Sequence, residues 1–180
     1  VSPEDRRAAK AINFGLIYGM SSFGLSKQLG IAIPEAKEYM DIYFRRYPKI
    51  KNYMNEIKQF AKENGYVETM HGRKLYLPEI NSKRAQIRNY AERTAINAPV
   101  QGAAADIIKI AMIEIDKWLM QKKSKTKMIM QVHDELVFEI HEDDINQEVK
   151  NIVNIMQDCV SLDLPLEVNY GIEDNWGDAH

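Results

Sequence analysis

The sequence predicts an α+β fold, in which a helical lobe precedes a lobe that contains antiparallel strands. Apolar residues recur at helical spacing through most of residues 3–64. Short runs rich in β-branched and aromatic residues follow at 66–77, 129–140 and 164–172. Separation of helices from strands along the chain is typical of the α+β class. A length of 180 residues with 45% hydrophobic content suffices for one domain, or for two lobes that share a core.

The first half is predicted to be almost entirely helical, with helix ends marked by caps, glycines and prolines. The expected helices are 3–18 with Ser2 as N-cap and Pro3 at the first helical position, 21–29 ended by Gly30, and 34–64 with a restart or a kink at Pro48 and an end at Gly65.

The second half alternates strands with helices. Residues 66–77 form a hairpin around the glycine-containing turn "MHGRK". The long segment 83–120 is either two helices or one kinked helix, because Pro99 removes a hydrogen bond and Gly102 weakens the pattern. The remaining elements are a hairpin at 129–140, a helix at 143–161, a strand at 164–172 and a polar tail at 173–180.

The charges are unevenly distributed, although the net charge is only −2. Residues 45–93 carry 12 Lys and Arg against 5 Asp and Glu, whereas residues 133–180 carry 1 Lys against 13 acids. A phosphate-holding surface beside a cation-holding surface has this distribution, and so do two solubilising faces.

Targeting features are lacking in this sequence. The apolar runs are shorter than a bilayer requires, and the opening "VSPEDRRAAK" is not a signal peptide, so we expect a cytoplasmic protein with no membrane partner. The absence of an initiator methionine before Val1 indicates a piece of a longer chain. Cys159 lies in a helical apolar pattern, and we expect a small buried hydrophobe rather than a nucleophile.

A stripe of two cations and two aromatics follows the first helix. Arg6, Lys10, Phe14 and Tyr18 are four residues apart and share one face. Two cations one turn apart suit a triphosphate, but a surface pair beside an aromatic docked on the core has the same spacing. The helical glycines at 15 and 19 favour the first interpretation, because they let a flat base approach the backbone.

A second stripe, Arg93, Asn97 and Gln101, lies within an apolar segment. Such polar groups serve either a structural hydrogen-bond network or contacts to bases and sugars.

The run "QVHDELVFEI" places a histidine and two acids between two apolar strands. A solvated turn explains this pattern, and so does a metal-binding turn. Because neighbouring strand residues face opposite ways, the metal ligand is Asp134 rather than both acids. A two-metal site takes further carboxylates, and Asp106, Asp143 and Asp144 have no motif around them.

Three runs, in this order, closely resemble the C-terminal part of bacterial family A DNA polymerases: "RRAAKAINFGLIYG", "RTAINAPVQGAAADI" and "QVHDELVFEI". Their joint occurrence is specific where each alone is not. The resemblance implies the right-hand fold of fingers, palm and thumb. Residues 1–87 would form the fingers, with nucleotide-binding helices and a small hairpin, and residues 88–180 the C-terminal part of the palm with the metal-binding hairpin.

The resemblance also implies roles for individual residues. Arg6 and Lys10 would bind the phosphates of the incoming nucleotide, with Lys10 the proton donor to pyrophosphate. Phe14 would lie against its sugar and base, and Tyr18 would guard the stack at the templating position. The implied DNA contacts are Arg93, Asn97, Gln101, His133 and Tyr18. Asp134 would coordinate catalytic Mg²⁺, and Glu135 would assist beside it.

The implied function is template-directed DNA synthesis in replication and repair, by nucleotidyl transfer from a dNTP to the 3′-OH of a primer on primer-template DNA. The family's earlier palm motif and its thumb would lie upstream of Val1, so this chain is expected to need those segments and to be inactive alone. Two alternatives stay open: a non-catalytic nucleic-acid-binding module, which explains the basic middle, and a metal-dependent phosphoesterase, which explains the acidic half.

Overall fold

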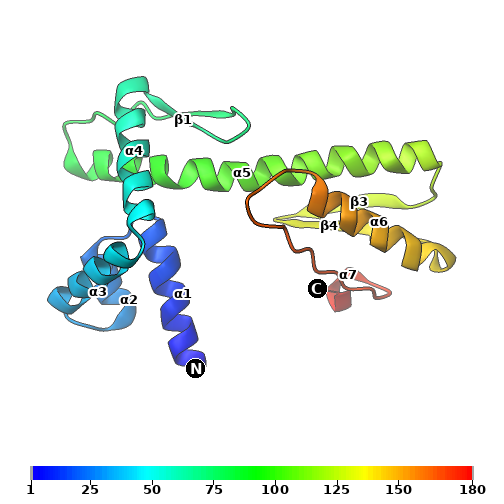
Figure 1. Ribbon diagram of the computed structural model, residues 1–180, viewed down its shortest axis with the longest axis horizontal. Helices are drawn as coiled ribbons and strands as arrows, with labels where there is room; N and C mark the ends of the chain where they lie inside the picture. The colour runs from blue at the N-terminus through cyan, green and yellow to red at the C-terminus, as the bar shows by residue number, and fades with distance from the viewer. Residues whose placement is uncertain (1, 180) are drawn as a thin grey trace. The chain divides into compact units, whose positions relative to one another are not determined.

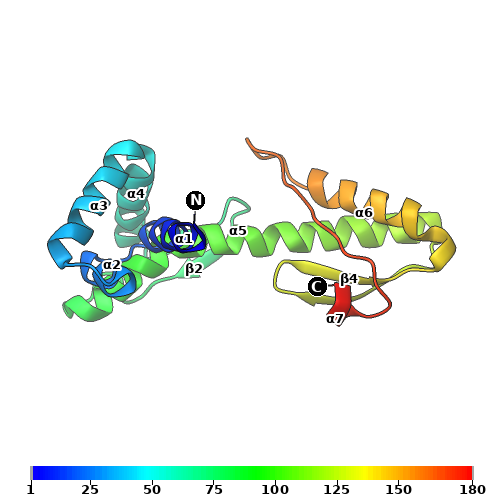
Figure 2. The same cartoon turned by 90° about the horizontal axis from the view of Figure 1, so that it is seen from below.

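The computed structural model describes residues 2–179, which are shown in two views in Figures 1 and 2. The chain divides into two compact units, one up to Gly102 and the other from Ala103 onward. Helix α5 (Ala85–Lys122) contributes residues to both units. Helices dominate the first unit, while the second combines a hairpin with helical segments, so the predicted α+β class is confirmed.

The first unit contains four helices and a small hairpin before α5. Their limits are α1 (Pro3–Ile17), α2 (Ser22–Leu29), α3 (Ile33–Arg46), α4 (Pro48–Asn64), β1 (Tyr66–Glu68) and β2 (Lys74–Tyr76). The predicted helices are therefore confirmed to within one or two residues, and the chain restarts at Pro48 rather than continuing through a kink.

Local chemistry explains these limits. The Ser21 hydroxyl accepts a hydrogen bond from the Gly24 backbone N–H at 3.2 Å, which caps the start of α2. Gly30 and Gly65 end α2 and α4 at left-handed φ angles of 69° and 75°. Glycine adopts this conformation without the steric cost that a Cβ imposes, so both helices stop where the sequence predicts.

Two apolar clusters hold the first unit together. The cluster of α1, α2 and α3 has Leu16, Leu25 and Ala36 at its centre, each almost fully buried. The second cluster joins α4, the β1–β2 hairpin and the N-terminal half of α5, and its buried members are Ala61, Val67, Leu77, Ile80, Ala91 and Ala95. The small alanines let the helices approach closely, while the hairpin covers the free side of α4.

Helix α5 is continuous, although Pro99 lies inside it. Pro99 has no N–H, so the carbonyl of Ala95 loses its helical donor. One residue further along, the Tyr53 hydroxyl of α4 donates a hydrogen bond to the carbonyl oxygen of Ile96 at 3.2 Å. The side chain of Tyr53, which is distant in sequence, thus satisfies a backbone acceptor in the turn of α5 that Pro99 interrupts.

We expect Tyr53→Phe to lower the free energy of unfolding by about 0.5–1.5 kcal/mol, the usual net contribution of one hydrogen bond. Urea denaturation followed by circular dichroism measures the change. Tyr76→Phe is the matched control, because Tyr76 is 70% exposed. If the free energy of unfolding falls equally in the two variants, the Tyr53 hydroxyl has no stabilising role of its own.

The second unit packs a hairpin and helix α6 beside the C-terminal half of α5, as both views show. Its elements are β3 (Lys127–Val132), β4 (Glu135–Glu139), a 3₁₀ turn η1 (Glu142–Asp144), α6 (Ile145–Asp158) and the short α7 (Trp176–Ala179). β3 and β4 pair antiparallel, with Val132 opposite Glu135 and an irregularity between Met128 and Met130. The extra residue there is typical of a β-bulge, which increases the local twist.

The core of the second unit centres on Ile115, Leu119 and Ile152, against which both strands pack their apolar side chains. A two-stranded ribbon is marginally stable alone in water. The hairpin therefore depends on α5 and α6 for its stability.

The prediction of a strand at residues 164–172 is wrong. No regular structure is assigned between Leu162 and Ile172, and the described sheets contain only β1–β2 and β3–β4. Leu164 and Tyr170 are 77% and 66% exposed. The side-chain pattern suits a strand, but a strand also needs a neighbour for its backbone hydrogen bonds, and within the part of the chain that the structure describes this segment has none in a ladder.

Candidate nucleotide-binding pocket

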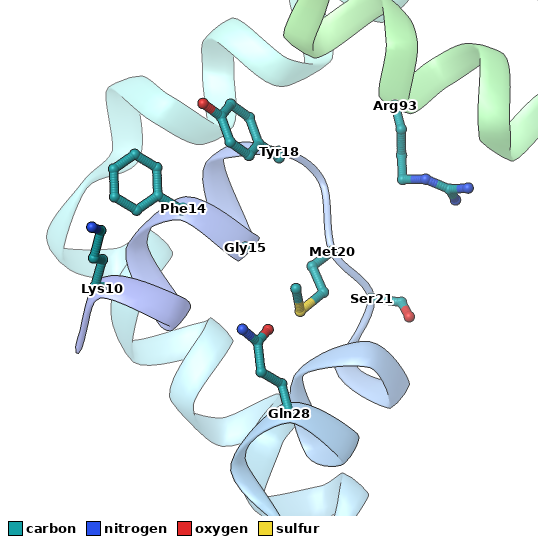
Figure 3. Close-up of a pocket in the computed structure, with 8 residues that line it drawn as sticks. All are labelled: Lys10, Phe14, Gly15, Tyr18, Met20, Ser21, Gln28 and Arg93. Atoms are coloured by element: carbon teal, nitrogen blue, oxygen red, sulfur yellow. The ribbon is translucent and has the colours of Figure 1, made fainter. Parts of the chain in front are cut away.

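A cavity of about 660 Å³ opens in the first unit beside α1. Its lining, drawn in Figure 3, consists of Lys10, Phe14, Gly15, Tyr18, Met20, Ser21, Gln28 and Arg93. The cavity thus joins one face of α1 to α2, to the residues that connect these two helices, and to α5. A volume in this range is that of a small-molecule site lined by apolar surface and a few polar groups.

Helix α1 supplies the aromatic wall of the cavity and one of the two cations that line it. The rings of Phe14 and Tyr18 are 6.1 Å apart between centroids and tilted by 35°. The Lys10 ammonium lies 5.9 Å from the centroid of Phe14, within range of a cation–π attraction. Lys10 and Phe14 are exposed, and Phe14 keeps 49% of its surface open to solvent. A flat ring with an accessible face and a nearby cation can hold a base and an anionic group together.

Arg93 of α5 brings the second cation to this cavity. Asn97 and Gln101 continue the stripe along α5, as the four-residue spacing predicts. Arg93 and Gln101 are exposed, whereas the Oδ1 atom of Asn97 is buried and has no hydrogen-bond partner within the described part of the chain. Arg6 is exposed one turn before Lys10 on α1. The structure therefore gathers Lys10, Phe14, Tyr18 and Arg93 on one cavity.

Gly19 lies outside α1 and ends it, so the helix end by itself accounts for a glycine at this position. Its N–H donates to the carbonyl of Leu16 at 3.0 Å, and the N–H of Met20 donates to the carbonyl of Gly15 at 2.8 Å. With Gly19 at a φ of 75°, these two bonds form a Schellman motif. The glycine is required by the left-handed helix end.

Gly15 does permit a close approach, but the group that approaches is a side chain of the chain itself. An ideal Cβ at Gly15 would lie 2.7 Å from Cε of Met20. Sequence reasoning missed Met20, Ser21 and Gln28 as lining residues. The glycine at position 15 indicated a close approach to the backbone, but the sequence did not identify Met20 as the group that approaches.

The predicted metal-binding turn lies in the second unit. His133 and Asp134 form a two-residue turn between β3 and β4, and Glu135 begins β4 rather than lying in the turn. His133 has a φ of 51°, a left-handed conformation that costs a non-glycine residue energy. Its carbonyl accepts a hydrogen bond from the amide of Gln131 at 2.6 Å. The result is a defined turn with both side chains exposed.

Among the residues whose side chains the structure describes there is no complete metal site, because no group of three or more His, Cys, Asp and Glu converges. Asp134 is exposed, Glu135 is half-buried, and the candidate Asp106 is buried on α5. Magnesium in proteins takes several oxygen ligands in near-octahedral geometry. One turn carboxylate with its neighbour is a partial donor set and does not fit a resident metal centre.

Cys159 borders a second, smaller cavity of about 310 Å³ between α5 and α6. Its thiol is half-buried and donates to the carbonyl of Met156 at 3.2 Å. Burial raises the pKa of the Cys159 thiol above its usual value, and the nearby Asp158 carboxylate adds to this. A raised pKa keeps the thiol protonated, which agrees with a packing role rather than a nucleophile.

Among the described residues no helix combines the length and the apolar character needed to span a bilayer.

Comparison with known proteins identifies the family. The model of DNA polymerase family A matches residues 1–178. DNA polymerase I of Pseudomonas aeruginosa is 53% identical over 180 residues, which are all of this chain and 20% of that protein. DNA polymerase I of Streptococcus pneumoniae serotype 4 is 49% identical over 179 residues, or 99% of this chain and 20% of that protein.

A solved structure agrees with these relatives. The POL domain of Pol1 from M. smegmatis, in complex with DNA primer-template and dNTP, superposes with a TM-score of 0.95 at 42% identity. The match covers 99% of this chain and 32% of that chain. This chain spans about a fifth of the length of the curated relatives it matches. On the extent of the match and the level of identity, the chain belongs to DNA polymerase family A.

Proposed function

We propose that this chain supplies the nucleotide-binding fingers and part of the palm of a DNA-directed DNA polymerase, which adds dNTPs to a primer 3′-OH in replication and repair. The observation that carries the proposal is the cavity on which Lys10, Phe14, Tyr18 and Arg93 converge, in a chain of family A. Residues 1–87 would be the fingers and residues 88–180 the palm portion, in a cytoplasmic enzyme.

The α1 stripe would hold the incoming dNTP. Arg6 and Lys10 lie one turn apart and are both exposed, so their cationic groups can reach the phosphate oxygens. Phe14 would pack on the sugar and base, and Tyr18 would guard the stack at the templating position. Lys10 would also donate a proton to the leaving pyrophosphate, since an ammonium group close to the phosphates can act as a general acid.

The α5 stripe would contact the primer-template. Arg93 borders the proposed nucleotide cavity, and the buried side-chain carbonyl oxygen of Asn97 has no hydrogen-bond partner among the described residues. A buried unsatisfied acceptor costs about 1–3 kcal/mol, and a donor on the DNA would recover part of this. Gln101 would extend the contact along the same face, and Tyr18 would contribute from α1. Binding would weaken with salt as phosphate contacts to the cations are screened.

The turn of the second unit would serve the primer end and the metal. His133 would lie by the primer terminus, Asp134 would supply one carboxylate to the catalytic Mg²⁺ ions, and Glu135 would assist beside it. Because the chain offers a partial donor set, the remaining ligands would come from other segments of the polymerase. The chain alone would therefore be inactive.

The second unit has a place for such segments. In a two-stranded ribbon both β3 and β4 have an open edge, and residues 164–172 have strand-forming side chains without a ladder. An upstream palm segment that adds strands here would satisfy these backbone groups.

A non-catalytic nucleic-acid-binding module is the second candidate, favoured by the excess of cations in residues 45–93. A module that only binds nucleic acid would leave Lys10 and Asp134 without a role. The phosphoesterase alternative has less support, because it requires a cluster of metal ligands, and the side chains that the structure describes form none.

A segment replacement tests the proposal. Residues 1–180 replace the corresponding 20% of the Pseudomonas aeruginosa DNA polymerase I, to which they align over their whole length. We expect the chimera to extend a primer in the presence of Mg²⁺, the 180-residue chain alone to give no extension, and Asp134→Asn to abolish extension by the chimera while primer-template binding persists. A folded chimera that binds DNA but never extends a primer would favour the binding module.

A further inference from the structure

The β1–β2 hairpin, which extends from the end of α4 in Figure 1, has a free edge on β2. Among the described residues the sheet contains only these two strands, so the outer side of β2 has no partner in a ladder. Backbone hydrogen bonds join positions 69 and 73 at one end of the hairpin and positions 65 and 77 at the other. Such pairs alternate with non-bonded pairs along an antiparallel ladder. The backbone N–H and C=O groups of Lys74 and Tyr76, which belong to the non-bonded pairs, therefore point away from β1.

The two faces of β2 differ in chemistry. Successive strand residues face opposite ways, so Lys74 and Tyr76 share one face and Leu75 lies on the other. On the first face the Lys74 ammonium lies 4.2 Å from the centroid of the Tyr66 ring, and the Tyr66 and Tyr76 rings are 5.9 Å apart. Leu75 lies on the same face as the buried Val67, yet it keeps 43% of its surface exposed. The edge thus offers a cationic, aromatic face and an apolar face that is incompletely covered.

The hairpin lies in the basic part of the chain. Residues 45–93, with 12 Lys and Arg against 5 acids, comprise the end of α3, all of α4, the hairpin and the start of α5. Helix α4, the hairpin and α5 pack together around the apolar cluster of Ala61 and Val67. A partner with acidic side chains is attracted to this surface. A second copy would bring the same basic surface with it, and a lysine on an edge strand opposes the pairing of identical copies.

A polypeptide fits this edge better than a nucleic acid. The alternating N–H and C=O groups of a strand edge are matched by another extended polypeptide chain, and nucleic acid lacks this pattern of donors and acceptors. Single-stranded nucleic acid instead needs open aromatic faces on which its bases stack. The Tyr66 ring lies under the Lys74 ammonium and meets the Phe60 ring edge to face, with centroids 5.6 Å apart. This ring is therefore engaged by side chains of the chain itself.

We propose that the outer edge of β2 is a docking site for an acidic polypeptide segment, which adds as a third strand with acidic side chains beside Lys74 and branched apolar side chains beside Leu75. An added strand alternates as its neighbour does, so acidic and apolar residues alternate in the partner. Main-chain hydrogen bonds to Lys74 and Tyr76 supply affinity, and the alternation supplies specificity. The residues that line the proposed nucleotide cavity do not include the hairpin, so this inference is independent of that function.

The test uses two fluorescein-labelled peptides of eight residues and the full 180-residue chain. In the probe, aspartate and valine alternate, whereas the control peptide has the same composition with all aspartates before all valines. Fluorescence anisotropy at fixed ionic strength measures the dissociation constants, and NMR follows the exchange of backbone amides with deuterium. We expect the alternating peptide to slow exchange at Lys74 and Tyr76, and the control peptide to leave it unchanged.

Tyr76→Pro is the sharpest variant. Proline lacks the N–H that the added strand requires, and the hairpin persists because this N–H faces outward on an edge strand. Binding weakens about tenfold relative to Tyr76→Ala, which removes the same ring but keeps the N–H. Lys74→Glu weakens binding about fivefold, the upper range for one exposed ion pair. Lys51→Glu changes the net charge equally at an exposed position near the start of α4, and it leaves binding nearly unchanged. Circular dichroism verifies that each variant is folded.

Protection of the β2 amides by the alternating peptide, lost in Tyr76→Pro, supports the inference. Equal binding of the two peptides, or equal losses in Lys74→Glu and Lys51→Glu, shows attraction by overall charge and overturns it. Slow exchange at Lys74 and Tyr76 that grows with protein concentration without peptide shows that a second copy occupies the edge instead. Displacement of the peptide by an equally charged single-stranded oligonucleotide shows a nucleic-acid surface, and a lack of saturable binding at millimolar peptide shows no such partner; either result overturns the inference.

Discussion

In the chimera described above, Lys10→Ala lowers the rate of nucleotide addition by about a hundredfold or more, the range typical of a lost general acid. Lys10 lines the cavity beside Phe14, where its ammonium can reach the phosphates of a bound dNTP. The same substitution leaves primer-template affinity nearly unchanged, because the partner proposed for Lys10 is the nucleotide rather than the duplex. Single-turnover primer extension measures the rate, and fluorescence anisotropy of a labelled duplex measures the affinity.

Two controls make this result specific. Lys37→Ala removes an exposed lysine of α3 that does not line the cavity, and it should alter neither quantity appreciably. Lys10→Arg retains the charge but cannot release a proton at neutral pH, so it should restore nucleotide affinity more than rate. Parallel losses of extension and DNA affinity in Lys10→Ala would instead indicate a general nucleic-acid-binding role.

Ile115→Ala is expected to lower the free energy of unfolding by about 2–5 kcal/mol, as for other large-to-small changes in packed cores. Ile115 is fully buried at the centre of the second unit, where α5, α6 and both strands of the hairpin meet. Its truncation leaves a cavity beneath the ribbon that carries Asp134. Trp118 packs against this cluster, so urea denaturation followed by tryptophan fluorescence reports the transition.

Ile113→Ala is the matched control for this change. It removes the same atoms from the same helix, but Ile113 is 54% exposed. Its effect should therefore stay within about 0.5 kcal/mol, as for other surface substitutions. A loss at position 115 no larger than that at position 113 would show that the second unit does not depend on this core.

The helix limits of the first unit were predictable because local chemistry determines them. Ser21 caps α2 through its own hydroxyl, and Gly30 and Gly65 end helices through a φ angle that other residues avoid. These interactions span only a few residues of sequence. The continuity of α5 through Pro99 was not decided by the sequence, because Tyr53, whose hydroxyl bonds the Ile96 carbonyl, lies 43 residues away along the chain.

The strand predicted at 164–172 failed for a related reason. Side-chain alternation indicates how well a segment suits a sheet, but backbone hydrogen bonds to a neighbouring strand make it one. Leu164 and Tyr170 have suitable side chains, and both are exposed in this chain.

The candidate pocket was predictable in part. Four-residue spacing placed Lys10, Phe14 and Tyr18 on one face of α1, because helical periodicity is a local property. That Arg93 borders the same cavity follows from packing between segments far apart in sequence. Met20 escaped prediction because its place depends on two glycines on different helices. The roles of these residues came from motif resemblance rather than from spacing.

The open edges of the β3–β4 ribbon have a practical consequence for work on the isolated chain. Unpaired strand edges are templates on which a second copy can add its own strand, and Ile129 and Met130 on β3 present apolar side chains there, 57% and 39% exposed. Self-association of the purified chain will therefore grow with protein concentration. A lysine in place of Ile129 is a simple way to keep the preparation monomeric, since a charge on an edge strand opposes stacking of copies.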